Sequence, residues 1–344
     1  MSKKPLQIMD VTVREGSYAI QYKFTARQVG EIALAIDTAG IPYMEVGNGG
    51  GLGVPDEYYR GIKPQSTDIE QLRTAKKNVK KCKIGLMANP SPFTKKEHIQ
   101  AVKKEVDFLR IAARIDDIEA ARENVETART LEIPVFFQMM RSSKRSTKEI
   151  VKAAKKAESY GANAVYVVDT IGWFLPSQVR EIILALKETV AIPIGFHAHN
   201  NLMLAVANSL AAVEAGVEYV DGSLLGFGRD AGNAQLEALV AVLQRTGHLK
   251  NVNLDKLLEA ADQLIAPIMP ETQGSPPLQI ATAHANVCLY PIDIYQQIAH
   301  AAQIPLPDLI KKLGTYSESE PDIERVLKDL GKDPKEIFKK LGLA

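Results

Sequence analysis

The chain has 344 residues, of which 46% are hydrophobic and 24% are charged, and its formal net charge is +1. This is the composition of an ordinary globular protein, and so small a net charge argues against partners such as nucleic acid or an anionic membrane. The sequence has no run of about 18 apolar residues and no signal-peptide pattern at its start. With only Cys82 and Cys288, no disulfide framework is indicated, and we expect a cytoplasmic location.

Short apolar runs alternate with longer amphipathic segments over the first part of the chain. The predicted strands span residues 6–13, 43–47, 83–89, 108–114, 135–140, 164–170, 193–199 and 219–226. The predicted helices span residues 25–39, 68–81, 95–104, 116–131, 147–160, 176–190, 202–215 and 234–246. An open doubly wound sheet has the same local rhythm, but eight strand–helix units in about 245 residues favour an α/β fold of the (β/α)8 TIM-barrel type.

Several predicted helices begin with recognisable signals. Thr25, Asp68 and Thr147 are residue types that cap helix N-termini, and Pro176 suits the first turn of a helix. These signals support the helical assignment of the segments that follow them.

The rhythm changes beyond residue 266. Residues 266–279 contain four prolines and read as a linker, and the remaining sequence has helical patterns throughout. We therefore predict a barrel domain over residues 1–266 and a C-terminal helical extension over residues 267–344.

Active sites of such barrels lie where the strands end at the C-terminal face. The sharpest signal there is His197 and His199, whose i, i+2 spacing on a strand places both side chains on one face. Two such imidazoles can bind one metal ion, or they can be core histidines satisfied by hydrogen bonds.

Barrel closure makes the ends of the first, seventh and eighth strands neighbours in space. Glu15 should then lie near the two histidines, with Asn233 on the same rim. One carboxylate, two imidazoles and an amide oxygen suit Mn²⁺, Mg²⁺, Co²⁺ or Zn²⁺. We predict a divalent metal site at this rim.

Arg14 precedes the predicted metal carboxylate. Adjacent strand residues point in opposite directions, so Arg14 and Glu15 need a turn or bulge to share a site, and Gly16 permits one. The guanidinium could bind a carboxylate and stabilise an enolate oxygen; the alternative is a simple ion pair at a strand end.

Two glycine-rich stretches are candidate ligand-binding loops. Residues 47–53 lack the G-x-G-x-x-G spacing and are expected to form a flexible loop at the barrel mouth. Residues 226–231 match that spacing but belong to the eighth unit rather than the first, and no acidic residue follows at the required distance, which argues against a dinucleotide site.

The stretches DVTVREG, FHAHNN and GFGRDAGNAQLE, in this order, resemble the DRE-TIM metallolyase superfamily. Within it the pattern is most similar to the 4-hydroxy-2-oxovalerate aldolases, through GSYAI, the segment from residue 199 to 224, GNAQLEALVAV, the chain length and the helical C-terminal part. The resemblance covers nearly the whole chain.

The resemblance implies a role for each matching residue. Glu15, His197 and His199 match the metal ligands, and Asn233 matches the residue that coordinates or approaches the metal. Arg14 matches the arginine that binds the oxo acid. Thr170 matches a hydroxyl residue that helps to place the substrate carboxylate, and Glu45, at the end of the second strand, is a further substrate-binding candidate.

The sequence departs from the aldolase pattern in its acid–base group. Tyr18 stands where the aldolases have a histidine base, and a phenol with an ordinary pKa near ~10 is a poor base at neutral pH. His284 lies in the region of a functional tyrosine of the aldolases and is a substitute candidate, as is Tyr290; both also suit helix packing. Glu15 replaces the usual aspartate, and Asn48 a usual histidine.

The resemblance implies a lyase that cleaves a 4-hydroxy-2-oxo acid to pyruvate and an aldehyde through a metal-bound enolate, with Mn²⁺ as the expected ion. The alternatives are an acyl-CoA/2-oxo acid condensing synthase of the homocitrate or isopropylmalate type, and a weakly active metal-binding partner subunit. An acylating aldehyde dehydrogenase is an implied partner, and we expect a homo-oligomer.

Overall fold

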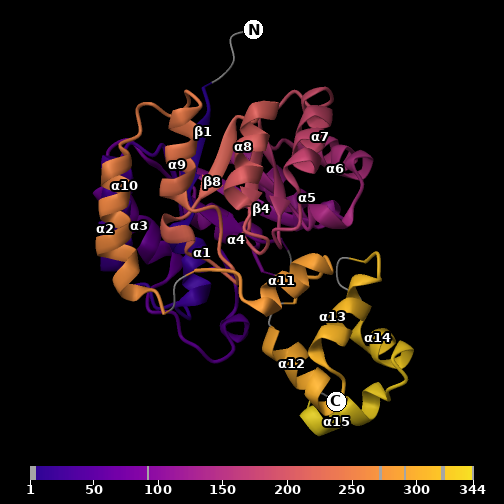
Figure 1. Ribbon diagram of the computed structural model, residues 1–344. Helices are drawn as coiled ribbons and strands as arrows, with labels where there is room; N and C mark the ends of the chain where they lie inside the picture. The colour runs from indigo at the N-terminus through magenta and orange to yellow at the C-terminus, as the bar shows by residue number, and fades with distance from the viewer. Residues whose placement is uncertain (1–4, 91–92, 271–272, 290–291, 319–321, 343–344) are drawn as a thin grey trace.

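The central feature of the computed structural model, which describes residues 5–90, 93–270, 273–289, 292–318 and 322–342, is a closed barrel of eight parallel strands (Figure 1). The barrel closes because β1 pairs in parallel with both β2 and β8. The predicted (β/α)8 fold is confirmed. The strands are β1 (Gln7–Asp10), β2 (Tyr43–Val46), β3 (Lys83–Ala88), β4 (Phe108–Arg114), β5 (Val135–Met140), β6 (Ala164–Asp169), β7 (Ile194–Ala198) and β8 (Tyr219–Gly222).

Helices cover the outside of the barrel. They are α2 (Ala26–Thr38), α3 (Asp68–Asn78), α4 (Lys96–Val102), α5 (Arg122–Thr130), α6 (Thr147–Tyr160), α7 (Pro176–Lys187), α8 (Ala205–Ala215), α9 (Leu236–Arg245) and α10 (Leu254–Ala260). Shorter turns of helix are η1 (Asp56–Tyr59), η2 (Ile118–Ala121), η3 (Ser142–Lys144), η4 (Leu224–Gly226), η5 (Ala261–Ile265) and η6 (Ala266–Ile268).

Three of these helices begin with a reciprocal capping box. The caps of α2, α3 and α6 are Thr25, Thr67 and Ser146. The predicted cap Thr25 is correct, whereas Asp68 and Thr147 lie one residue inside their helices. The preceding hydroxyl takes the cap position in both cases because a Glu three residues later returns its hydrogen bond.

The first predicted strand is too long. It ends at Asp10, and α1 (Thr12–Ala19) follows almost at once. The Asp10 carboxylate accepts hydrogen bonds from the backbone N–H and the hydroxyl of Thr12, so the side chain turns the backbone out of the strand. The alternation of Val11 and Val13 looked like a strand, but both residues are buried on a short helix entrance instead.

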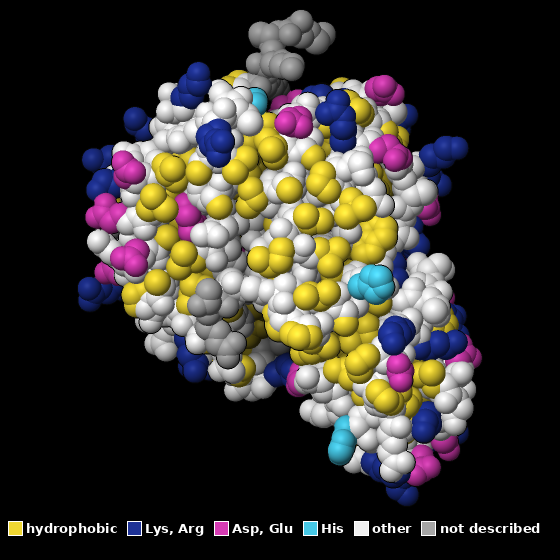
Figure 2. Space-filling model, viewed as in Figure 1, with side chains coloured by type: hydrophobic (Ala, Val, Ile, Leu, Met, Phe, Trp, Pro, Cys, Tyr) yellow, Lys and Arg dark blue, Asp and Glu magenta, His cyan; other side chains and the backbone are white. Residues whose placement is uncertain are grey.

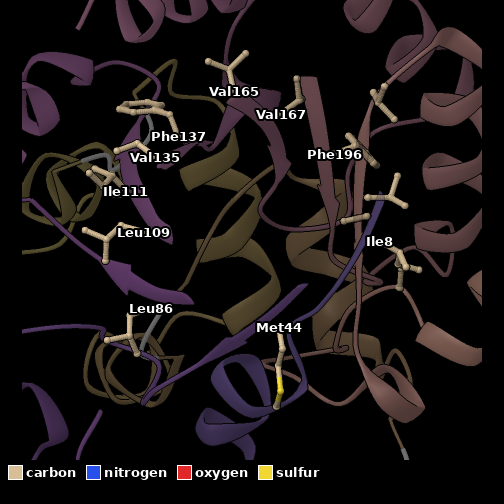
Figure 3. Close-up of a cluster of buried hydrophobic side chains, with 14 of the residues drawn as sticks. Ile8, Met44, Leu86, Leu109, Ile111, Val135, Phe137, Val165, Val167 and Phe196 are labelled. Carbon is tan, nitrogen blue, oxygen red and sulfur yellow. The ribbon is translucent and has the colours of Figure 1, made fainter. Parts of the chain in front are cut away.

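The pleat of the strands separates two environments. Outward-facing residues such as Leu109 and Ile111 belong to the main apolar core (Figure 3). Alternate residues therefore face the barrel interior, where Phe108, Phe136 and Tyr166 form an aromatic cluster. Polar side chains are also buried on these strands: Glu45, Arg110, Gln138, His197 and Asp221. The interior is thus apolar in one part and strongly polar in another.

The C-terminal residues form a helical extension, as predicted. Its helices are α11 (Pro277–His284), α12 (Ile292–Ala301), α13 (Leu306–Gly314), α14 (Ile323–Asp329) and α15 (Pro334–Leu341). Figure 1 shows the extension in orange to yellow below the barrel, and it has an apolar core of its own that includes Leu309, Leu313 and Leu327.

Polar contacts join the extension to loops of the barrel. Arg60 forms a bidentate ion pair with Asp293 of α12 at 2.7 and 2.9 Å. The Ser143 hydroxyl donates to the Asn286 side chain, and the Lys144 ammonium donates to the carbonyl of Tyr316. The extension therefore rests on loops that follow β2 and β5.

Among the described residues no helix is both long enough and apolar enough to cross a membrane. In Figure 2, side chains of both charge signs are interspersed around the rim of the visible face, in keeping with the net charge of +1.

Candidate functional site

Three of the predicted metal ligands converge at the barrel mouth. Glu15 comes from α1, His197 from β7, and His199 from the residue after that strand ends. All three are buried, and one potential ligand atom from each lies within 4.8 Å of the others. The Glu15 carboxylate and His197 Nε2 are 3.3 Å apart. The side chains are therefore close enough to hold a single ion.

Two buried polar atoms near the three candidate ligands lack a hydrogen-bond partner in the described part of the chain. His199 Nδ1 and the Asn233 amide oxygen are buried, and neither has a hydrogen-bond partner among the described residues. Leaving such groups unsatisfied is costly. A cation held by Glu15 and the two histidines would satisfy an acceptor lone pair here, and a donor set of carboxylate, imidazole and amide oxygen suits a first-row divalent ion. The residues present fit a metal.

Asn233 reaches this position through a close turn of the chain. A short antiparallel bridge pairs it with His199, and its amide nitrogen lies 3.2 Å from His197 Nε2. A Cβ atom at Gly228 would lie 2.1 Å from the Asn233 amide oxygen. A side chain at position 228 would therefore collide with Asn233. This gives Gly228 a structural reason that does not involve binding of a dinucleotide.

A closed ring of ionic contacts includes two of the candidate ligands, Glu15 and His197. In order it runs from Glu15 to Arg14 (2.5 Å), Glu45 (3.2 Å), Arg110 (2.9 Å), Asp221 (2.6 Å), His197 (2.8 Å) and back to Glu15 (3.3 Å). Two guanidinium groups and three carboxylates give this ring a charge of −1 when the histidine is neutral. A divalent cation would bring the total to +1, which complements the carboxylate of a small acid.

Arg14 and Glu15 share the site in a way the sequence did not predict. No strand bulge brings them together, because both lie on α1. Gly16 is not a turn residue either; a Cβ there would lie 2.4 Å from the Phe227 ring. The glycine therefore lets the first helix pack directly against the loop that follows β8.

The electrostatics favour a carboxylate and a neutral imidazole as ligands. Burial opposes the charge on Glu15, but Arg14 and the two histidines together outweigh it and hold the pKa of the carboxyl well below its usual range. Burial lowers the pKa of His199 well below its usual range, so this imidazole is neutral. Asp221 bonds to Nδ1 of His197 at 2.8 Å and so directs Nε2 toward Glu15.

The site opens into a pocket of about 480 Å³. Arg14, Tyr18 and Thr170 line its wall, as do the three candidate ligands. The Thr170 hydroxyl accepts a 2.7 Å hydrogen bond from the backbone N–H of Arg141. The substrate-binding candidates Arg14 and Thr170 are thus placed where a ligand could contact them.

Tyr18 also lies on the pocket wall. Its hydroxyl donates to the carbonyl of Gly49 at 2.7 Å and lies 3.2 Å from the Tyr58 hydroxyl. Burial raises the pKa of the phenol well above its usual value, so Tyr18 stays protonated at neutral pH. The glycine-rich loop is packed tightly against this ring, since a Cβ at Gly49 would lie 2.3 Å from it. The loop therefore contributes to the pocket wall, at the barrel mouth where it was predicted to lie.

Three of the predicted site residues that the structure describes do not line the pocket: Asn233, Glu45 and His284. Glu45 is fully buried and forms ion pairs with Arg14 and Arg110, which lie between it and the pocket. His284 is exposed at the end of α11 and is absent from the pocket wall, because the helix turns it to solvent. Cys288 lines the pocket from the extension instead. Tyr290 lies outside the described residues.

Sequence reasoning missed several residues of the site. Arg110 and Asp221 belong to the ring, and Arg141 and Arg229 line the pocket. A usable signal was present for the first two, because each is a charged residue inside an apolar strand pattern, at an inward-facing position. Arg141 and Arg229 follow strands and carry no comparable local signal.

A closed (β/α)8 barrel with a buried carboxylate–imidazole cluster at the C-terminal ends of its strands has the form of a metal-dependent barrel enzyme. Comparison with known proteins narrows this class. Residues 5–264 match the HMGL-like family, and the chain belongs to that family, which implies a divalent metal.

Relatives support the same assignment. A 4-hydroxy-2-oxovalerate aldolase of Geobacillus thermodenitrificans is 36% identical over 99% of this chain and 91% of its own length. An oxaloacetate decarboxylase of Mycobacterium tuberculosis is 35% identical over 93% of this chain and 95% of its own length. The N-terminal domain of a candidate aldolase from Bacteroides vulgatus has a similar structure, with a TM-score of 0.72 and 25% identity, covering 85% of this chain and 97% of that one.

Proposed function

We propose that the chain is a divalent-metal-dependent aldolase that cleaves a 4-hydroxy-2-oxo acid to pyruvate and an aldehyde. The observation that carries the proposal is the convergence of Glu15, His197 and His199 beside Arg14 in one pocket. It is supported by the several relatives named 4-hydroxy-2-oxovalerate aldolase at 34–39% identity.

The ion would be held by Glu15, His197 and His199, with Asn233 beside them, and we propose Mn²⁺. When bound, such an ion supplies Lewis-acid polarisation of the oxo group of the substrate. Glu45 and Arg110 hold the neighbouring Arg14 through the ionic ring, so its guanidinium is fixed before substrate arrives.

The chain's own residues account for the remaining requirements. Arg14 binds the oxo-acid end and stabilises the negative charge that develops on the enolate oxygen as the bond between C3 and C4 breaks. Loss of the 4-hydroxyl proton to water leaves the aldehyde. The phenol of Tyr18, protonated and on the pocket wall, then donates a proton to C3 to give pyruvate, and the proton released to water restores the phenol.

The oxaloacetate decarboxylase relative favours a second candidate activity. Loss of carbon dioxide from oxaloacetate leaves the same pyruvate enolate as the aldol cleavage, so one set of stabilising groups would serve both reactions. Pyruvate is the product in each case.

The test is a pyruvate-release screen on chelated protein reloaded with Mn²⁺, Mg²⁺, Co²⁺ or Zn²⁺. We expect metal-dependent pyruvate release from a 4-hydroxy-2-oxo acid. Release from oxaloacetate alone would favour the decarboxylase. Release of free thiol from acetyl-CoA in the presence of a 2-oxo acid would favour the alternative activity, that of an acyl-CoA/2-oxo acid condensing synthase.

We further propose that the helical extension docks an acylating aldehyde dehydrogenase that consumes the aldehyde, and that the protein acts in the cytoplasm as a homo-oligomer. Co-purification with such a dehydrogenase tests the docking, and the mass of the protein in solution tests the homo-oligomer. Co-purification without any pyruvate release would favour the weakly active partner subunit.

A further inference from the structure

The pocket has two sides that barrel topology keeps apart. Strand order runs from β1 to β8 around a closed barrel, so the metal ligands from the β7, β8 and β1 region face the ends of β4 and β5 across the mouth. Arg114 ends β4 and Arg141 follows β5, and both line the same pocket as the ligands. A substrate whose oxo acid lies at the metal would extend toward these arginines.

Cations outnumber carboxylates on the β4–β5 side. Between the last residue of β4 and α5, and between β5 and α6, the four cations are Arg114, Arg141, Lys144 and Arg145, and the three carboxylates are Asp116, Asp117 and Glu119. These charges sum to +1. Asp116 is shared, because it lies 3.5 Å from Arg114 and 3.2 Å from Arg145.

The cations on this side also act on one another. Lys144 lines a small cavity together with Arg141 and Thr170. Burial lowers the pKa of the Lys144 ammonium, and the neighbouring Arg141 and Arg145 lower it further. This side of the pocket therefore holds a positive potential that a bound anion would relieve.

Arg141 lies at the pocket wall in a strained backbone conformation. Its φ of 61° is in the left-handed region, which an L-residue other than glycine occupies only when its surroundings impose it. Its N–H donates to the Thr170 hydroxyl at 2.7 Å, which links the end of β5 to the end of β6. Strain of this kind concentrates at binding sites.

We propose, building on the proposed function, that the β4–β5 side is a subsite for a second anionic group of the substrate, with Arg141 as its central residue and Arg114 beside it. The preferred substrates are then 2-oxo acids that carry a distal carboxylate. Such an acid places its oxo-acid end at the metal and its far carboxylate on the arginines, whose planar guanidinium groups bind carboxylates in two-point fashion.

The chemistry is unchanged by this preference. Cleavage of 4-hydroxy-2-oxoglutarate between C3 and C4 gives pyruvate and glyoxylate, with the hydroxyl proton lost from one product and a proton gained at C3 of the other. The substrate 4-hydroxy-2-oxovalerate, which ends in a methyl group, is the matched monoanion.

The test compares kcat/KM for these two acids on the Mn²⁺-loaded enzyme. We expect at least a tenfold preference for the carboxylate-ended acid. Arg141→Gln should lower kcat/KM for that acid about 10- to 100-fold, mainly through KM, and change the value for the methyl-ended acid by less than threefold. Arg27→Gln, which removes an exposed charge on α2, should change neither value. A third substrate that ends in a phosphate group distinguishes recognition of any negative charge from recognition of a carboxylate.

Preference for the methyl-ended acid, or an equal loss on both acids in Arg141→Gln, would overturn the subsite. If Arg141→Gln does not fold, Arg114→Gln makes the same comparison. If neither acid releases pyruvate, the proposed function fails, and binding still decides the subsite. In that case 2-oxoglutarate should bind at least tenfold tighter than 2-oxopentanoate by calorimetry, and equal affinities would refute the proposal.

Discussion

At the scale of single residues, two of the candidate ligands, Glu15 and His197, are each held by a neighbouring charged side chain. Arg14 lies 2.5 Å from Glu15, and Asp221 lies 2.8 Å from Nδ1 of His197. Partners of this kind fix the orientation of a ligand and its protonation state. The geometry for binding an ion is therefore built before the ion arrives.

Removal of a ligand should release the ion. Glu15→Ala and His199→Ala each take one donor from the set, so we expect metal affinity to fall at least about 100-fold and turnover to be lost. Metal content after desalting, measured by mass spectrometry, is the readout. His300→Ala, an exposed histidine on α12, is the control; wild-type metal content in both ligand variants would remove the assignment.

The phenol of Tyr18 should matter to the chemical step. Because burial raises its pKa well above 10, it stays protonated at neutral pH and cannot cause a loss of activity as the pH rises toward 10. Tyr18→Phe removes the donor, and we expect kcat to fall about 100-fold with metal content unchanged. Tyr160→Phe, whose hydroxyl bonds to Glu119 outside the pocket, is the matched control. An unchanged kcat in Tyr18→Phe would exclude the role.

At the scale of elements, turns outside the site also depend on single carboxylates. Asp37, near the end of α2, accepts backbone hydrogen bonds from three successive residues that lead into β3, namely Lys80, Lys81 and Cys82. Burial opposes the charge, but these hydrogen bonds prevail and lower the pKa of Asp37. One side chain thus joins the end of α2 to the loop between α3 and β3.

Asp37→Asn should show a dependence on pH with a definite sign. The folded pKa lies below the unfolded value of about 4, so the carboxylate stabilises the fold above that value and loses this effect as the pH falls through the folded pKa. We expect the variant to be less stable by about 1–2 kcal/mol at pH 7 and nearly equal to the wild type near pH 2. Urea unfolding at both pH values measures this, with the exposed Asp262→Asn as control. A constant difference across pH would contradict it.

Elements were predicted well where the signal is local. The eight strands and their helices follow from alternation and periodicity within single segments. The error at α1 has a physical cause, since Val11 and Val13 alternate as a strand would, whereas the Asp10 side chain and the packing of Gly16 on Phe227 impose a helix. A contact between residues 211 positions apart leaves no local pattern.

At the scale of the whole molecule, two apolar cores are present. One lies between the barrel strands and their helices, and the other lies within the extension. The contacts described between the two parts are polar, such as the Arg60–Asp293 pair, whose side chains are 51% and 44% exposed. Exposed pairs of this kind contribute only about 0–1 kcal/mol.

The two cores should therefore unfold separately. Leu327→Ala removes a fully buried side chain of the extension, which costs about 2–5 kcal/mol. We expect calorimetry to show one transition at a lower temperature and a second, from the barrel, unchanged. Leu258→Ala, at a side chain 49% exposed on α10, should alter neither. A single transition that shifts as a whole would show that the cores unfold as one unit.

The sequence by itself determined the barrel, the helical extension and the histidine pair, because strand spacing, helix period and the i, i+2 geometry of a strand are properties of neighbours in the chain. Only the tertiary structure decided that Glu45 pairs with two arginines, that His284 faces solvent, and that Arg110 and Asp221 complete an ionic ring that includes Glu15 and His197. Those facts depend on which inward-facing residues meet when the barrel closes. Such contacts are set by strand register and by the packing of distant segments, and no local sequence pattern encodes either of these.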